Sequence, residues 1–203
     1  MQPSGAEYAT RTTTRLLDAL HDPGNQPAWI HLDARYRPVI IGLARRLGLT
    51  ATDAEEVAQQ TLAEFVTAYR ENRYDRAKGR LSSWILGIAH HTTLRVHRKG
   101  RSQAHEAEHL SQVPEESALR SIWTDERDRA ILNRAMSSLR DETSVDDRTL
   151  QAFELVALRG VPAAEVADQC GMSLNQVYVA KSRVTKRLRE LIEELTAAFE
   201  EDA

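Results

Sequence analysis

The sequence predicts an all-α protein, in which two small helical domains are joined by a flexible linker. Apolar residues recur at steps of three and four along most of the 203 residues, and no segment alternates like a β-strand. A polar stretch over residues 102–124, which contains Pro114, separates the two helical regions and is typical of a linker. We therefore expect an N-terminal tail over residues 1–11, one helical domain over 12–101 and a second over 125–203.

Composition and charge exclude several classes of protein. The chain carries 27 Lys and Arg against 30 Asp and Glu, a formal charge of -3, which alone does not suggest a nucleic-acid binder. No apolar run approaches the about 20 residues of a membrane span, and the first 20 residues lack the apolar core of a secretory signal. A single cysteine, Cys170, excludes an internal disulfide and a cysteine-based zinc site. We expect a cytoplasmic protein with no membrane partner.

Three helices are predicted in the first domain. The first covers about residues 29–47, where Pro38 predicts a kink or a local break. The second opens at Thr52, which forms an apparent capping box with Glu55, and extends to about Tyr69. A polar loop over residues 71–80 leads to the third, predicted over 81–99.

The third helix and the loop before it are basic. Residues 76–105 contain seven Lys and Arg and no acid, and basic groups around an aromatic ring suit a nucleic-acid strand with one base stacked. Trp84 is equally compatible with a core position, because tryptophan is mostly buried in folded proteins. The candidate nucleic-acid contacts are Lys78, Arg80, Trp84, His91, Arg95, Arg98 and Lys99.

A helix-turn-helix is predicted over residues 162–191. Ala167, Gly171 and Val177 have the spacing that lets two helices cross closely, turn tightly and share a core. The second helix begins with a capping box and presents amide, basic and phenol side chains that suit base edges and phosphates. The candidate DNA contacts are Ser173, Asn175, Gln176, Tyr178, Lys181, Ser182 and Arg183, with Lys186 expected on phosphate. An ordinary helical hairpin with a charged outer face is the alternative.

The order of these segments resembles a bacterial RNA polymerase sigma factor of the extracytoplasmic-function (ECF) group of the sigma-70 family. Residues 53–65 (DAEEVAQQTLAEF) are similar to region 2.2 of that family, residues 79–99 to regions 2.3 and 2.4, and residues 160–191 to region 4. Three similar segments in the family's order make the resemblance specific.

The resemblance implies a transcription initiation factor with no catalytic site and no cofactor. Its partners would be core RNA polymerase, through the beta-prime clamp helices and the beta subunit, and promoter DNA. The basic helix would engage the melting minus-ten element, the 71–80 loop would take a flipped base, and the helix-turn-helix would read the minus-thirty-five element. The implied polymerase contacts are Asp53, Glu55, Glu56, Gln59 and Gln60.

The sequence departs from the family at two places. The family usually has an acid where Gln60 stands, and a Lys-Ser-Arg triplet where residues 178–180 read Tyr-Val-Ala; Lys181, Ser182 and Arg183 come three residues later. Thr61 follows Gln60, which prompts the hypothesis that a Ser/Thr protein kinase adds negative charge to the polymerase-facing surface by phosphorylating Thr61. Control by an anti-sigma factor, with Thr61 an unmodified residue on a helix flank, is the alternative.

Two other functions remain open at this point. A stand-alone transcriptional regulator would use only the helix-turn-helix and would need a dimer interface or an effector pocket in residues 12–100. A zinc metalloenzyme is suggested by residues 105–109 (HEAEH), which match H-E-x-x-H, although no third ligand stands at a known spacing.

Overall fold

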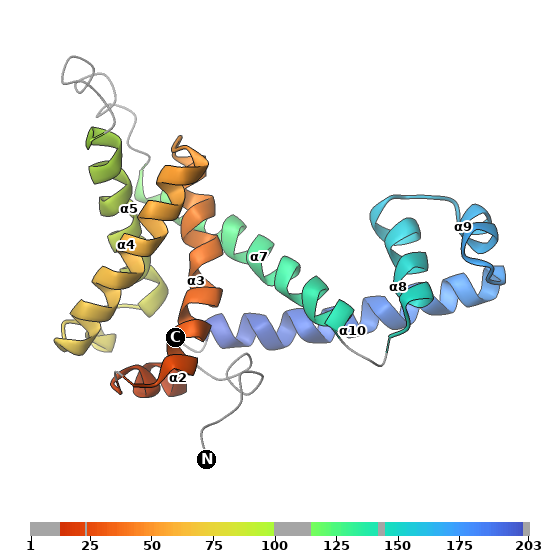
Figure 1. The fold of residues 1–203 in the computed structure, drawn as a ribbon, viewed down its shortest axis with the longest axis horizontal. Coiled ribbons are helices and arrows are strands. Elements are labelled where there is room, and N and C mark those ends of the chain that lie inside the picture. The colour runs from red at the N-terminus through yellow and green to blue at the C-terminus, as the bar shows by residue number, and fades with distance from the viewer. Residues whose placement is uncertain (1–12, 23, 100–114, 142–144, 201–203) are drawn as a thin grey trace. The chain divides into compact units, whose positions relative to one another are not determined.

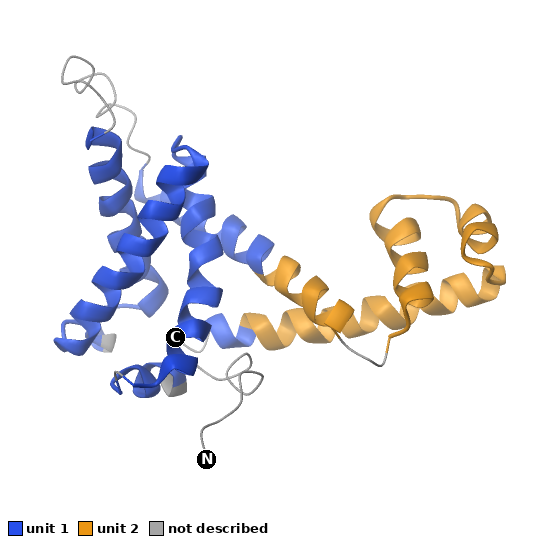
Figure 2. Cartoon of the chain, in the orientation of Figure 1, with its two compact units in different colours: residues 1–130, 197–203 blue, residues 131–196 orange. Residues whose placement is uncertain are grey.

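The structure is a computed structural model that describes residues 13–22, 24–99, 115–141 and 145–200. In these ranges the chain forms helices and no strand, as the sequence predicted. None of the described helices combines the length and the apolar composition needed to cross a membrane. The chain divides into two compact units, residues 1–130 with 197–203 and residues 131–196 (Figure 2), which are described separately below.

Three helices form the body of the N-terminal unit (Figure 1). They are α3 (Gln26–Arg46), α4 (Ala51–Arg70) and α5 (Leu81–Lys99), which pack against one another, while α2 (Thr13–Leu20) packs against α3. α5 has the bounds predicted from the sequence, and the loop before it contains one 3-10 turn, η1 (Arg76–Lys78). α3 runs through Pro38 without interruption, so the local break expected there is absent.

The start of α4 differs from the prediction by two residues. Its N-cap is Thr50, whose Oγ1 accepts a hydrogen bond from the Asp53 backbone N–H at 3.2 Å and donates one to the Asp53 carboxylate at 2.7 Å. The backbone of Thr50 is extended (φ -65, ψ 166), as an N-cap requires. Asp53 is therefore the acid of the first turn, and Glu55 and Glu56 lie beyond it. Matching the helix dipole, which acts within the first turn, does not explain those two carboxylates.

The predicted linker ends earlier than expected, because residues 116–124 belong to the long helix α7 (Glu116–Asp141). Leu119 and Trp123 are buried in the N-terminal unit, where the Trp123 ring stacks on Tyr36 at 6.5 Å between centroids. Leu119 and Trp123 are four residues apart and lie on one face of the helix, which the mostly polar composition of this stretch concealed. The rest of the predicted linker, up to residue 114, and the predicted tail over residues 1–11 lie outside the described residues. The division into domains stays a prediction.

At Gly42 of α3, a side chain of α7 takes the space that a Cβ would need. A Cβ at position 42 would lie 2.8 Å from Cγ of Glu126, whose side chain is buried. We expect Gly42→Ala to lower the free energy of unfolding by about 1–3 kcal/mol through overpacking. In a Glu126→Ala background the same change is expected to raise it by about 0.5–1 kcal/mol, because alanine is the better helix residue. Thermal unfolding of the wild type, the two single variants and the double variant measures the effect of Gly42→Ala in each background. Equal effects in the two backgrounds would contradict the contact.

The C-terminal unit contains the end of α7, α8 (Asp147–Phe153), the π-helix η3 (Glu154–Leu158), α9 (Ala163–Cys170) and all but the last residues of α10 (Leu174–Glu200). Its first apolar cluster joins α7, α8 and α10 through Leu139, Phe153 and Val184. Its second cluster joins α8, α9 and α10 and consists of Ala152, Val166, Ala167, Cys170, Val177 and Ala180. Gly171 ends α9 in the left-handed conformation, with φ 60. The two helices thus meet as the helix-turn-helix spacing predicted.

Candidate nucleic-acid interface

α10 has a buried side and an exposed side that correspond to the predicted helix-turn-helix. Val177, Ala180 and Val184 point into the unit, at steps of three and four. The predicted DNA contacts are all exposed: Ser173, Asn175, Gln176, Tyr178, Lys181, Ser182 and Arg183. Leu174 has 46% of its surface exposed, because it stands at the first position of the helix, before the core begins.

Ser173 and Gln176 form the predicted capping box at the start of α10. The Ser173 backbone N–H donates to the Gln176 side-chain Oε1 at 2.7 Å, and the Gln176 N–H donates to the Ser173 Oγ at 3.2 Å. Two backbone donors that a helix start leaves open are satisfied in this way. The Gln176 amide is consequently held against the helix start.

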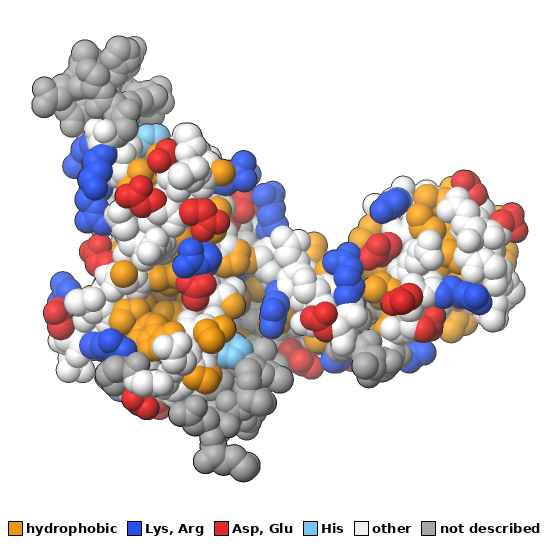
Figure 3. Space-filling view, in the orientation of Figure 1, with side chains coloured by type: hydrophobic (Ala, Val, Ile, Leu, Met, Phe, Trp, Pro, Cys, Tyr) orange, Lys and Arg blue, Asp and Glu red, His pale blue; other side chains and the backbone are white. Residues whose placement is uncertain are grey.

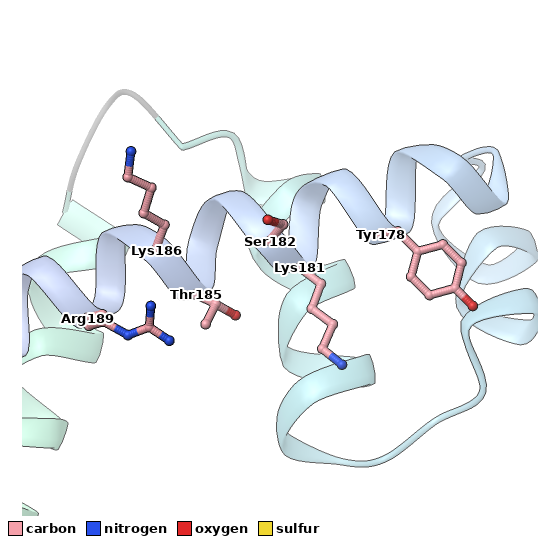
Figure 4. Close-up of a pocket in the computed structure, with 6 residues that line it drawn as sticks. All are labelled: Tyr178, Lys181, Ser182, Thr185, Lys186 and Arg189. Atoms are coloured by element: carbon pink, nitrogen blue, oxygen red, sulfur yellow. The ribbon is translucent and has the colours of Figure 1, made fainter.

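A hollow runs along the exposed side of α10 (Figure 4), lined by Tyr178, Lys181, Ser182, Thr185, Lys186 and Arg189. Tyr178, Lys181, Thr185 and Arg189 project from one side of the helix in this view. Thr185 and Arg189 were not among the predicted contacts. Thr185 and Arg189 are three and seven residues after Ser182, which places them on the same helix face. The helical period alone could therefore have added them to the candidate contacts. Three positive charges beside three hydroxyl groups suit a run of phosphates.

The basic side of the N-terminal unit lies on α5 and the loop before it. His91, Arg95, Arg98 and Lys99 are exposed on α5, and Lys78 and Arg80 are exposed in the loop. Figure 3 shows Lys and Arg side chains gathered over the C-terminal half of α5, beside Asp and Glu side chains over the N-terminal half of α4. Lys78 forms an ion pair with Asp75 at 3.5 Å.

Arg95 links the two predicted sites of this unit. Its guanidinium donates to the Gln60 side-chain oxygen at 3.3 Å and reaches the Glu64 carboxylate at 3.5 Å. A predicted DNA contact is thus paired with a predicted polymerase contact on the neighbouring helix. Glu64 was missed, although it lies four residues after Gln60 on the same face of α4. Both partners of the Arg95–Glu64 pair are about half exposed, so the pair contributes little to stability and can exchange for a phosphate.

Trp84 lies at the edge of an aromatic cluster rather than free on the surface. The ring of Tyr74 stacks on it with centroids 5.2 Å apart and an interplanar angle of 19°, and Phe65 meets it edge-on at 5.5 Å. Trp84 is half-buried. Tyr74 comes from the 71–80 loop, where its hydroxyl donates to the Gly79 carbonyl at 3.3 Å. One face of the predicted stacking platform is therefore covered by a residue of the loop.

The predicted polymerase contacts lie along α4. Glu55, Glu56 and Gln59 are exposed, whereas Asp53 and Gln60 are half-buried. Glu55 accepts a hydrogen bond from Arg37 of α3 at 3.2 Å. The pKa of Arg37 is raised, mainly by its hydrogen bond to Asp33. The exposed carboxylates are thus next to a guanidinium that stays charged.

Two histidines of α5 are adjacent but differ in environment. Burial, followed by the charge of neighbouring His91, lowers the pKa of His90. His90 is half-buried and His91 is exposed. The lowered pKa means that His90 contributes less positive charge to the surface of α5 than an unperturbed histidine would.

Thr61 is not on the surface, and the sequence-based hypothesis was wrong on this point. It lies on the inner side of α4 and 0% of its surface is exposed. Its Oγ1 has no hydrogen-bond partner among the described residues. The polar hydroxyl suggested a helix flank, but Thr61 lies three residues after buried Ala58 and four before buried Phe65, on the face that α4 turns inward.

Metal binding finds no support in the described residues, where no group of three or more His, Cys, Asp and Glu is placed to hold an ion. The segment HEAEH, residues 105–109, lies outside them.

A family model and two curated relatives all relate this chain to sigma factors. The sigma-70 region 2 family model matches residues 32–103, the segment that contains α4 and α5. The ECF RNA polymerase sigma factor RpoE of Cereibacter sphaeroides is 24% identical over 168 residues, which cover 80% of this chain and 91% of that protein. The ECF RNA polymerase sigma factor SigE of Mycolicibacterium smegmatis is 27% identical over 184 residues, which cover 89% of this chain and 68% of that protein. The region 2 match and the similarity to both relatives support a sigma factor of the ECF group of the sigma-70 family.

Proposed function

We propose that this protein is a transcription initiation factor that binds core RNA polymerase and directs it to specific promoters. The observation that carries the proposal is a sigma-70 region 2 match over residues 32–103 in the same chain as a helix-turn-helix. Such a factor performs no chemistry of its own. A stand-alone regulator that used only the helix-turn-helix would have no need of region 2.

In this proposal α10 recognises the minus-thirty-five element. Its exposed side carries the polar and basic residues of the candidate set, and the inner side fixes the helix on α9. Lys181, Lys186 and Arg189 would bind phosphates and set the register of the helix. Residues near the start of α10 would read base edges in the major groove.

In this proposal α5 and the 71–80 loop bind the minus-ten element. Exposed Arg98 and Lys99 would bind the strand backbone, and Arg95 would join them by exchanging Glu64 for a phosphate. A flipped base could stack on Trp84 only by taking the place of Tyr74. Stacking on an aromatic ring offsets part of the few kcal/mol that unpairing costs.

In this proposal core polymerase binds the exposed carboxylate face of α4, where Glu55, Glu56 and Gln59 lie. The beta-prime clamp helices and the beta subunit are the partners that the family implies. This face is next to the basic side of α5, with Arg95 bridging the two. Binding of polymerase and of the minus-ten strand would then be coupled through one side chain.

Run-off transcription on a promoter library tests the function. Core polymerase with this protein is expected to initiate at a defined subset of promoters, whereas core polymerase alone is not. Pull-down of core polymerase separates the proposal from the regulator alternative. Promoter binding without any binding of core polymerase, in every phosphorylation state, would favour the regulator.

The buried position of Thr61 makes the hypothesis of activation by phosphorylation testable. A kinase reaches the hydroxyl only when α4 opens, and control by an anti-sigma factor needs no such opening. We expect Thr61→Glu to lower the free energy of unfolding by several kcal/mol, because it buries an unpaired carboxylate. Thr61→Val removes an unpaired hydroxyl and is expected to be neutral or stabilising.

Ala63→Glu places the same charge at an exposed position of α4 and is the matched control. Thermal unfolding and run-off transcription of the three variants give the readout. If Thr61→Glu melted like the wild type and raised transcription, the buried position would be incorrect and phosphorylation would be favoured.

A further inference from the structure

Two large apolar residues are exposed on the DNA-facing side of α10. Tyr178 is 53% exposed and Val179 is 57% exposed. An exposed apolar residue is ordinary on a protein surface, so its position on the helix decides whether it has a role. Val179 is of particular interest because it is the middle residue of Tyr178, Val179 and Ala180, which stand where the family usually has Lys-Ser-Arg.

Val179 lies within the outward face of the helix. It is four residues after Asn175, three before Ser182 and seven before Lys186, and these three side chains are all exposed. The buried stripe of Val177, Ala180 and Val184 lies on the opposite side. Helical spacing therefore places Val179 among the residues that would face the floor of the groove.

Gln176 is less available for reading bases than its exposure suggests. Its Oε1 already accepts the Ser173 N–H at 2.7 Å. Pairing bidentately with adenine would require the amide to turn towards the base, at the expense of the cap. One of the two amides that the sequence offered for base reading is thus engaged in holding the helix start.

The basic residues around this apolar pair favour DNA as its partner. Tyr178 belongs to the hollow whose other walls are Lys181, Ser182, Thr185, Lys186 and Arg189 (Figure 4). A cationic rim attracts phosphates, and a valine has no donor or acceptor for the polar edge of a base. In the major groove, thymine is the base that presents a methyl group.

We propose that Val179 is a specificity-determining residue that contacts the 5-methyl group of a thymine in the minus-thirty-five element. The inference rests on the proposed function and names the chemistry by which its helix-turn-helix discriminates. Tyr178 lies beside Val179 and covers the methyl contact from water. The preference for thymine follows from apolar contact in place of a bidentate hydrogen bond.

Replacing thymine by deoxyuridine tests this at the level of one methyl group, because base pairing is unchanged. The probe is the strongest promoter from the library, bound by holoenzyme, with each thymine of its minus-thirty-five element replaced in turn. At one or two positions we expect binding to weaken about fourfold, the effect of removing one buried methyl or methylene group. Val179→Ala holoenzyme is expected to bind the thymine promoter more weakly and to lose its sensitivity to uracil at those positions.

Lys186→Ala is the matched control on the same helix face. It is expected to weaken binding to thymine and uracil promoters equally, so that their ratio stays at the wild-type value. Equal sensitivity to uracil in the wild type and Val179→Ala, or none in the wild type, would overturn the methyl contact while leaving promoter selection intact. A holoenzyme that selected no promoter at all would overturn the proposed function, and the methyl contact with it.

Discussion

Val177→Asp is expected to unfold the C-terminal unit, whereas Val179→Asp, two residues later on the same helix, is expected to leave it folded. Val177 is 1% exposed and packs in the cluster that joins α9 to α10. A carboxylate placed there has no cation beside it within that cluster, and such burial costs several kcal/mol. That is a large part of the stability of a small domain.

Circular dichroism during heating measures the difference. Val177→Asp should lose the cooperative transition of the C-terminal unit and its specific promoter binding. Val179→Asp should keep the transition and bind promoters more weakly, because a negative charge then enters the groove between the phosphate backbones. Similar melting of the two variants would show that α10 does not turn Val177 inward.

Phe65→Ala is expected to lower the free energy of unfolding of the N-terminal unit by about 3–5 kcal/mol, the range for removing a buried aromatic ring. Phe65 is fully buried on α4, and its ring contacts those of Tyr69 at 5.9 Å and Trp84 at 5.5 Å between centroids. The cavity would undermine the support of Trp84 and its stacked Tyr74 as well.

Thr67→Ala, an exposed change two residues further along α4, serves as the control and is expected to change the free energy of unfolding little. Urea unfolding, followed by tryptophan fluorescence and by circular dichroism, measures both variants. A loss below about 1 kcal/mol for Phe65→Ala would mean that the aromatic cluster is not part of the core.

Elements with a dense local pattern could be predicted from the sequence. α5 has the predicted bounds because its apolar residues recur regularly and Gly79 precedes it. The turn between α9 and α10 could be predicted because Gly171 and the Ser173 capping box act over a few residues. These are local interactions, and their partners are near in the sequence.

Features that depend on distant partners could not be predicted. Trp123 is buried because Tyr36 lies across from it, which the polar stretch around Trp123 does not reveal. Thr61 is buried by the packing of α4, although its hydroxyl suggests a surface position. Arg95 pairs with Glu64 across 31 residues of sequence, so a basic stripe that looked free is partly neutralised.

Cys170 gives the C-terminal unit a built-in chemical reporter. It is the single cysteine of the chain, and it is buried between α9 and α10 as a free thiol. A thiol reagent therefore reacts with Cys170 only when this unit opens locally. The labelling rate then measures how often the packing between α9 and α10 is broken. The same rate, measured with and without polymerase or promoter, would report how strongly each partner holds the two helices together, and no substitution or attached dye would be needed.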